Sequence, residues 1–535
     1  MRKSTVFRGW THPLWTSLVV GAPVWAASLG ATQVLAADPA RKPNFIVILM
    51  DDLGYRDVGV YGSKEIPTPN IDRLAHEGMR FSNSYSTCPV CSPARAALLT
   101  GRYQGRYGLE WVLSPHRTTG YCQWGLDVRE KTLGDLLRQE GYATAAIGKW
   151  HVGDREQFFP TNRGFDSFYG YLQAGHFFLN PDQAEKEHPS HPWFKWALSN
   201  GGLEGAKYYY DYYNAPIYRN KEAGGFQGYL TEALDNEAIQ FIEKNKARPF
   251  FLYLSEAGMH TPVQAPEKYM NRFPKIADDR MRRSYAATLS AIDDGIGDIM
   301  AKLKALGLEK DTVIFFTSDN GGPSFWEPRP EILDTIKAGT PLGAGLPAGK
   351  ESDLSAICEL FQWRIGANGS DNHPLSFGKG ILYEGGVRVP LIIKWPGVVP
   401  AGKVSEAVVS HLDIVPTCMA AAGGKLPADR EYDGADLRPF FAGKTGDWTD
   451  RPLFWRVWKD RAVRQGKWKL VWSGAATPRL YDLSRDLEEK NNVAAANPAV
   501  VQQLQTAWTE WDKKNVAPLY QYEDLGRAWK MHRAD

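Results

Sequence analysis

The chain of 535 residues is longer than one small hydrophobic core requires, and this length predicts a large domain joined to a smaller one. Its formal net charge is +2, and it becomes about −1 once residues 1–36, which hold three basic side chains and no acidic one, are set aside. A chain so close to neutral gives no support for binding nucleic acid, so we expect no nucleic-acid partner.

Residues 1–36 have the features of a secretory signal peptide. Their start is basic, residues 14–35 are largely apolar and uncharged, and Ala36 and Ala37 offer the small side chains typical of a cleavage site. Pro23 interrupts the apolar stretch, which argues against a permanent membrane span. We therefore expect cleavage near Ala36, a secreted or bacterial periplasmic mature protein, and no stable membrane anchor.

Four short apolar runs have the composition of buried strands in a parallel sheet. Helical stretches lie between them, as at 132–139, where Thr132 and Asp135 have the spacing of a helix-capping box and Gly141 ends the turn. Alternating strands and helices predict an α/β fold, with a large doubly wound mixed sheet sandwiched by helices. The four apolar runs are 45–50, 143–147, 250–254 and 313–317.

The pattern changes beyond about residue 440. Three short runs there are typical of antiparallel strands, and residues 500–511 are typical of a helix. We therefore expect a main domain over 37–440 and a smaller C-terminal α+β subdomain, with an antiparallel sheet, over 441–535. The Gly- and Pro-containing segment 323–372 is expected to be an insertion or a lid over the edge of the main sheet. The three runs are 453–458, 462–464 and 468–472.

Polar side chains follow all four apolar runs of the main domain. The carboxyl ends of parallel strands meet at one edge of a sheet, and ligands bind there because loops diverge and helix N-termini point inward. We expect these side chains to gather in one site, with Lys149 and His151 on the same side of an extended segment. The set is Asp51 and Asp52 after the first run, Lys149 and His151 after the second, His260 after the third, and Asp319 and Asn320 after the fourth.

The acidic residues of this set predict a metal site. Taken singly, Asp51-Asp52 is better explained as a helix cap or a turn, and Asp319-Asn320 can likewise be a simple turn. Together they offer carboxylate and amide oxygens, the hard ligands that Ca²⁺ and Mg²⁺ prefer. Carboxylates about 4 Å apart repel one another by roughly 4 kcal/mol per pair at an effective dielectric constant of about 20, so such a cluster needs a cation.

Cys91 is a candidate for modification. The five cysteines are an odd number, so an exported chain leaves at least one unpaired, modified or reactive. Pro93 suits the first turn of a helix that Gly101 ends, which places Cys91 at a helix N-terminus, where anions are favoured. Cys88 and Cys91 have the spacing of a zinc site, but no second cysteine pair follows and we expect no zinc. Taken by themselves, these residues fit a buried structural cysteine at position 91 equally well.

Over residues 43–430 the chain resembles the type I, formylglycine-dependent sulfatases of the alkaline-phosphatase-like superfamily, and we expect a bacterial carbohydrate sulfatase. The central motif is Cys91-x-Pro93-x-Arg95, which continues through residue 102, and residues 480–492 match more weakly. The resemblance implies that a separate maturation enzyme converts Cys91 to formylglycine, the nucleophile. It also implies that one calcium ion is held by Asp51, Asp52, the modified Cys91, Asp319 and Asn320.

The same resemblance implies a set of catalytic residues around the formylglycine. Lys379 belongs to it, although its Gly-Lys-Gly lacks the spacing of a phosphate-binding loop. The implied reaction is hydrolysis of a sulfate ester, in which basic side chains stabilise charge on the sulfuryl oxygens and histidines transfer protons. The implied catalytic residues are Cys91, Arg95, Lys149, His151, His260 and Lys379, of which Lys149, His260 and Lys379 also bind substrate.

The expected substrate is a sulfated oligo- or polysaccharide, because export and a long insertion favour a large substrate over a small aryl sulfate. His176 is a candidate sugar contact, while most of the aromatic residues that are dense over 158–229 suit a core. Residues 374–377 depart from the family, which often has an Arg-Gly pair there. The resemblance therefore does not predict which residues form this wall of the substrate pocket. Three other functions stay open: an arylsulfatase for small substrates, a phosphodiesterase or phosphonate monoester hydrolase of the same fold, and an inactive glycan-binding protein.

Overall fold

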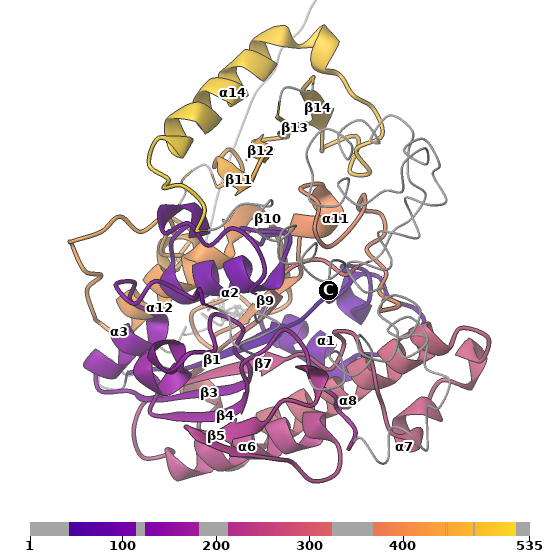
Figure 1. Ribbon diagram of the computed structural model, residues 1–535, viewed down its shortest axis with the longest axis vertical. Coiled ribbons are helices and arrows are strands. Elements are labelled where there is room, and N and C mark those ends of the chain that lie inside the picture. Colours follow the sequence, from indigo (N-terminus) through magenta and orange to yellow (C-terminus); the bar gives the residue numbers. More distant parts are fainter. Residues whose placement is uncertain are drawn as a thin grey trace, which may run out of the picture. The chain divides into compact units, whose positions relative to one another are not determined.

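The computed structural model describes residues 42–113, 123–180, 212–323, 368–444, 446, 448–474 and 477–519 (Figure 1). The predictions for residues 1–36 and for most of 323–372 lie outside these residues. The main sheet has the strand order β10-β2-β9-β8-β1-β7-β3-β4-β5-β6. Its strands are β1 (Asn44–Met50), β2 (Met79–Tyr85), β3 (Ala143–Lys149), β4 (Ser167–Tyr171), β5 (Ile217–Arg219), β6 (Glu222–Gly224), β7 (Phe250–Glu256), β8 (Thr312–Ser318), β9 (Leu391–Lys394) and β10 (Lys403–Ser410).

The centre of the main sheet is parallel, as predicted from the apolar runs. Strands β8, β1, β7, β3 and β4 run in the same direction, and so do β10 and β2. In contrast, β9 is antiparallel to both of its neighbours, and β5 and β6 form an antiparallel edge. The sheet is therefore mixed, which confirms the predicted fold class.

Helices cover both faces of the main sheet, so the buried strand β1 alternates between two hydrophobic cores. Ile46 and Ile48 belong to the core that includes α1, α6 and α8, whereas Phe45 and Val47 belong to the core that includes α2, α3 and α12 (Figure 1). The helices before the second sheet are α1 (Pro69–Glu77), α2 (Cys91–Thr100), α3 (Leu133–Gln139), α6 (Leu230–Lys244), α7 (Glu267–Met270), α8 (Arg280–Ala305), α11 (Glu384–Val387), α12 (Ile414–Ala421) and α13 (Arg438–Phe441).

The register of the parallel strands brings their carboxyl ends to one edge of the main sheet. Met50, the last residue of β1, is aligned with Ser318 of β8 and with Glu256 of β7. The residues that follow these positions therefore emerge side by side. This alignment sets Asp51 next to Asp319, although the two are far apart in the sequence.

Two local predictions have different outcomes. Thr132 Oγ1 accepts from the Asp135 N–H at 3.1 Å and Asp135 Oδ2 accepts from the Thr132 N–H at 2.9 Å, so the predicted capping box is confirmed. The predicted extended segment through His151 is wrong, because β3 ends at Lys149 and His151 has a φ of +56°. Gly148, still within β3, has a φ of +96°, a conformation that favours glycine, so the backbone departs from regular extended geometry just before the strand ends.

A second, antiparallel sheet has the order β11-β12-β13-β14, and we call it the C-terminal sheet. One of its faces packs on α14 (Pro498–Asp512), where Leu504 and Trp508 enter the shared core. Its other face, including Trp455, packs on a core with Tyr85 of β2. The predicted helix and three of the strands are present, whereas the four-residue β14 was not predicted. The strands are β11 (Leu453–Val457), β12 (Asp460–Gln465), β13 (Trp468–Ser473) and β14 (Arg479–Asp482).

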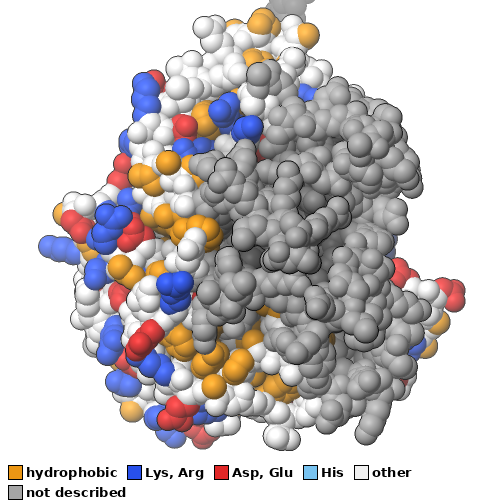
Figure 2. Space-filling model, viewed as in Figure 1, with side chains coloured by type: hydrophobic (Ala, Val, Ile, Leu, Met, Phe, Trp, Pro, Cys, Tyr) orange, Lys and Arg blue, Asp and Glu red, His pale blue; other side chains and the backbone are white. Residues whose placement is uncertain are grey.

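Charged side chains of both signs are interspersed over the described part of the face in Figure 2. Within the described ranges, no helix combines the length and the apolar character needed to cross a membrane. The acidic and basic side chains at the carboxyl edge of the main sheet differ from these surface charges because they are buried.

Candidate active site

Three acidic side chains meet at the carboxyl edge of the main sheet. Asp51 and Asp52 directly follow β1, Asp319 directly follows β8, and oxygen atoms of the three lie within 4.8 Å of one another. All three side chains are fully buried. Asn320 Nδ2 donates to Asp52 Oδ1 at 2.7 Å, which joins Asn320 to this acidic cluster. Asp52 has a φ of +60°, a backbone conformation that non-glycine residues rarely adopt and that is enriched at functional sites.

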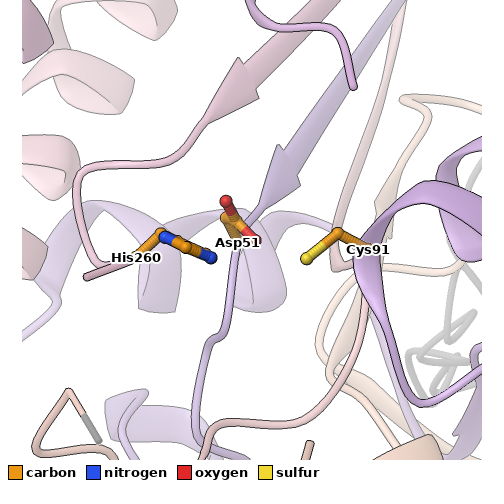
Figure 3. Close-up of side chains that lie close together, drawn as sticks. All are labelled: Asp51, Cys91 and His260. Carbon is orange, nitrogen blue, oxygen red and sulfur yellow. The ribbon is translucent and has the colours of Figure 1, made fainter. Parts of the chain in front are cut away.

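Cys91 faces the acidic cluster from the first residue of α2. Its Sγ forms a group with Asp51 and His260 in which the possible ligand atoms lie within 4.8 Å of one another, and the three side chains point toward a common centre (Figure 3). Pro93 lies in the first turn of α2, and Gly101, with a φ of +67°, ends it as predicted. Burial raises the pKa of the Cys91 thiol to about 12. An unmodified Cys91 therefore keeps its proton near neutral pH and is a poor nucleophile.

Each acidic side chain is paired with a basic side chain, and all of these pairs are buried. Three basic side chains thus face three carboxyl groups. A divalent cation added to this arrangement leaves a net positive site, which favours an anionic substrate. The pairs are Lys149 Nζ with Asp51 Oδ2 at 2.6 Å, Lys379 Nζ with Asp52 Oδ2 at 2.8 Å, and Arg95 Nη2 with Asp319 Oδ2 at 2.7 Å.

The three carboxyl groups differ in pKa. Burial acts to raise the pKa of Asp51, but Lys149 and the other basic groups around it outweigh burial and hold that pKa well below its usual value. Burial raises the pKa of Asp52, and burial together with the Asp51 charge raises the pKa of Asp319 to about 7. Burial therefore makes ionisation of Asp52 and Asp319 less favourable, an effect that a bound divalent cation opposes.

Two oxygen atoms at the acidic cluster have no hydrogen-bond donor among the described residues. They are Oδ1 of Asp51 and Oδ1 of Asn320, and both are buried. Arg95 Nη2 lies 3.6 Å from Asp51 Oδ1, too far for a hydrogen bond. Buried oxygens normally have a partner, and carboxylate and amide oxygens are ligands of Ca²⁺. Asp51, Asp52, Asp319 and Asn320 therefore fit a calcium ion.

The two histidines beside the cluster are held as defined tautomers. His151 Nε2 lies 2.9 Å from the Leu113 carbonyl oxygen, and His260 Nδ1 lies 2.7 Å from the Thr261 carbonyl oxygen. Since a carbonyl oxygen only accepts, these nitrogens donate and the opposite ring nitrogens carry the lone pairs. His151 Nδ1 has no hydrogen-bond partner in the described part of the chain, and His260 Nε2 lies 3.9 Å from Asp52 Oδ2. Burial lowers the pKa of both rings, so both are neutral near pH 7.

His176 differs from the other predicted site residues. Its Nδ1 lies 2.5 Å from the Phe177 carbonyl oxygen and its Nε2 lies 2.6 Å from the Ala215 carbonyl oxygen, and the ring is buried. These contacts engage both ring nitrogens with backbone and give no support to a sugar contact. The residues that the structure does bring together are Asp51, Asp52, Cys91, Arg95, Lys149, His151, His260, Asp319, Asn320 and Lys379.

Two residues that the sequence analysis did not assign to the site support it. Ser255 Oγ, in β7, accepts from Arg95 Nη1 at 2.5 Å. Asn368 Nδ2 donates to the carbonyl oxygens of Asp52 at 3.2 Å and Met259 at 2.9 Å. Neither residue carries a sequence signal, because both contact residues that are distant along the chain. Asn368 begins an Asn-Gly-Ser glycosylation sequon, but its side chain is fully buried and unavailable for glycosylation.

Comparisons with known proteins match nearly the whole described chain. The family model described as Sulfatase matches residues 43–424, and the model described as N-sulphoglucosamine sulphohydrolase, C-terminal, matches residues 373–514. N-acetylgalactosamine-6-sulfatase of Canis lupus familiaris is 35% identical over 449 residues, which cover 81% of this chain and 73% of that protein. Arylsulfatase G of Mus musculus is 33% identical over 414 residues, which cover 76% of this chain and 70% of that protein. The crystal structure of Ps i-CgsB in complex with k-i-k-neocarrahexaose is 34% identical, covers 92% of this chain and 98% of that chain, and has a TM-score of 0.74.

Proposed function

The chain belongs to the sulfatase family and is a sulfuric ester hydrolase, and from that premise we propose that it removes sulfate from an oligo- or polysaccharide with a formylglycine made from Cys91 and one bound calcium ion. The observation that carries this proposal is the convergence of Asp51, Cys91 and His260 at the carboxyl edge of the main sheet. Their possible ligand atoms lie within 4.8 Å of one another, beside the other acidic residues and their basic partners.

The calcium ion would be held by Asp51, Asp52, Asp319 and Asn320, with residue 91 as a further ligand. When bound, the ion supplies positive charge that favours an ionised oxygen nucleophile and a negatively charged substrate. Formylglycine supplies a hydrated aldehyde, with one hydroxyl to attack sulfur and a second whose deprotonation lets sulfate depart. The N-terminus of α2 adds backbone N–H groups that favour the same negative charge.

The two lysines bind the sulfuryl oxygens in this proposal. Lys149 contacts Asp51 and Lys379 contacts Asp52, so both ammonium groups are positioned before substrate binds. Preorganised positive charge stabilises the charge that develops on sulfuryl oxygens during the transfer. Arg95 has a different role, because its Nε and Nη1 donate to Asp319, Ser255 and the Lys149 carbonyl oxygen, and its Nη2 lies 2.7 Å from Asp319 Oδ2. We assign to Arg95 the orientation of Asp319.

The histidines move protons in this proposal. His260 Nε2, which carries a lone pair, first takes up a proton from solvent or from the attacking hydroxyl and then passes it to the departing alcohol oxygen. His151 accepts a proton at Nδ1 when the product sulfate is released, and the Leu113 carbonyl oxygen fixes the tautomer that leaves this nitrogen available. The hydrogen bonds to Leu113 and Thr261 therefore leave one ring nitrogen of each histidine able to accept a proton.

The substrate class is inferred from the relatives. N-acetylgalactosamine-6-sulfatase is named for a sulfated sugar, and Ps i-CgsB was solved with an oligosaccharide. We therefore propose a sulfated carbohydrate as the substrate, and a small aryl sulfate as the second candidate because Arylsulfatase G is also a relative.

We further propose cleavage of a signal peptide over 1–36, secretion or export to the periplasm, a catalytic domain over 37–440 and a C-terminal subdomain over 441–535.

The proposal is tested with protein co-expressed with a formylglycine-generating maturation enzyme. Mass analysis of the peptide that contains residue 91 is expected to show an aldehyde or its hydrate instead of a thiol. Sulfate release is then measured on N-acetylgalactosamine 6-sulfate, neocarrahexaose, an aryl sulfate and an aryl phosphate. Cys91→Ala is expected to abolish release, whereas Cys418→Ala, a control at another buried cysteine, is expected to retain it. Normal turnover by Cys91→Ala, or faster hydrolysis of the aryl phosphate, overturns the proposal.

A further inference from the structure

We propose that Lys469 and Glu489 are positioning residues for Lys379. A buried ion-pair network ties the C-terminal sheet to residues 376–388, which we call the Gly-Lys-Gly loop, and so holds the Lys379 ammonium group beside Asp52. This inference rests on the proposed catalytic role of Lys379. It extends the functional machinery to a sheet that contributes no residue to the predicted site.

Glu384, the first residue of α11, is the centre of this network. Its Oε1 accepts from Lys469 Nζ at 2.8 Å, and its Oε2 accepts from the Tyr85 hydroxyl at 2.8 Å and from Arg388 Nη1 at 3.1 Å. Its backbone N–H donates to Glu489 Oε2 at 2.8 Å, while Glu489 Oε1 lies 3.2 Å from Lys469 Nζ. Glu384, Lys469 and Glu489 are fully buried. The three residues thus form a closed ring that fixes both the side chain and the backbone of Glu384.

The first turn of α11 carries this constraint into the Gly-Lys-Gly loop. The Gly385 N–H donates to the Ser376 carbonyl oxygen at 2.8 Å, so the turn is bonded to the start of the loop. A Cβ at Gly386 would lie 1.9 Å from the Ile381 carbonyl oxygen. The backbone of the loop therefore packs directly against the backbone of this turn, so a displacement of one displaces the other.

The loop contacts both sides of the candidate active site through its backbone. The Lys379 N–H donates to the Gly322 carbonyl oxygen at 3.1 Å, on the segment that follows β8. The Gly380 N–H donates to the Pro89 carbonyl oxygen at 2.8 Å, on the segment that precedes α2. From this position the Lys379 side chain reaches Asp52 at 2.8 Å. The path from the C-terminal sheet to the site is therefore continuous.

A second contact ties the same loop to the segment that carries Glu489. Ser376 Oγ donates to the Glu488 carbonyl oxygen, one residue from the ion-pair ring. Burying charged groups is a weak source of stability, whereas losing one partner leaves an uncompensated charge that the surrounding backbone must accommodate. Misplacement of a catalytic group by about 1 Å lowers rates by about 10²-fold, so small shifts of the loop are expected to affect turnover.

A double-mutant cycle separates positioning from general destabilisation. Lys469→Met is expected to lower kcat for sulfate release by about 10²-fold in the otherwise normal protein. In a Lys379→Ala background the same change is expected to lower kcat by less than about threefold, because no ammonium group remains to be positioned. Glu489→Gln, which changes little volume, is carried through the same cycle, and near-UV circular dichroism verifies the fold of each variant.

Lys394→Met is the matched control. Lys394 is also buried and also bridges two glutamates, Glu77 at 2.6 Å and Glu309 at 2.9 Å, but it lies on β9 and outside the network around Glu384. The Lys394→Met variant is expected to be less stable than the parent protein and to keep kcat within about twofold of normal.

Four results each contradict one of the two proposals, and they are distinguishable. Equal losses of kcat in both backgrounds, or no loss in folded Lys469→Met and Glu489→Gln proteins, overturn the positioning role. Failure of both variants to fold, while Lys394→Met folds, also overturns it and assigns the network to stability. Full activity of Lys379→Ala overturns the proposed role of Lys379 itself.

Discussion

Lys149 Nζ and Asp51 Oδ2 lie 2.6 Å apart, and neither side chain is exposed to solvent. Removing one partner of a buried ion pair costs about 3–5 kcal/mol, because the other charge is left without compensation. We expect Lys149→Met to lower the free energy of unfolding by that amount in a chelator and by less in calcium, which would compensate the Asp51 charge. Chemical denaturation in both buffers measures the difference.

Lys467→Met serves as the control for this prediction. Lys467 pairs with Asp482 at 2.8 Å but is about half exposed, so its loss is expected to cost about 1 kcal/mol or less in either buffer. The same large loss for Lys149→Met with and without calcium would show that the ion does not bind at Asp51.

Calcium is expected to raise the melting temperature of the folded protein through the acidic cluster. Saturation at about 100 times the dissociation constant adds about 2.7 kcal/mol to the free energy of unfolding. Asp319→Asn is expected to lose most of this gain, whereas Asp460→Asn, at a buried aspartate of the C-terminal sheet, is expected to keep it. Thermal unfolding with and without calcium measures both. Equal calcium responses of the two variants would exclude Asp319 as a ligand.

His260 is expected to matter more for poor leaving groups than for good ones. A sugar alcohol needs a proton as it departs, whereas a nitrophenolate leaves without one. His260→Ala is therefore expected to lower kcat by about 10²–10⁴-fold on a sulfated sugar and far less on nitrophenyl sulfate. His76→Ala, at an exposed histidine of α1, is the control. A uniform loss on both substrates would assign His260 to binding and remove its role as the proton donor.

Glu256 and Asp235 are buried carboxyl groups that make stability depend on pH. Both carboxylate oxygens of Glu256, and Oδ1 of Asp235, have no hydrogen-bond partner among the described residues. Burial raises the pKa of Glu256 to about 8, and burial together with Glu256 raises the pKa of Asp235 well above its usual value. The folded chain therefore holds protons that the unfolded chain has lost, so the free energy of unfolding falls as pH rises from 4.5 to about 8.

Glu256→Gln is expected to flatten this pH dependence. Above pH 8 the variant is expected to be more stable than the parent protein by about 1.4 kcal/mol for each pH unit that separates the raised pKa of Glu256 from its usual value. Glu406→Gln, at an exposed glutamate, is expected to leave the curve unchanged. Denaturant unfolding across the pH range measures all three proteins, and parallel curves for Glu256→Gln and its parent would refute the account.

Local patterns along the chain were sufficient to predict the scaffold. The apolar run 45–50 predicted a buried parallel strand, and β1 is that strand, with side chains that alternate between two cores. The spacing of Thr132 and Asp135 predicted a capping box that the structure contains. These features depend on backbone geometry within a few residues, and the chain records that geometry as a local pattern. The placement of Cys91 at the start of α2 was predictable for the same reason.

The contacts that adjust the site were decided by tertiary structure. The extended segment predicted at His151 is replaced by a turn, and the buried Asn368 that binds the Asp52 carbonyl oxygen has no signal of its own. The ring of Glu384, Lys469 and Glu489 joins residues from two sheets. The chain by itself determined which side chains follow its strands, because that order is local. Only the packed fold decided which distant backbone and charged groups hold those side chains in place, because such contacts exist only once the sheets are assembled.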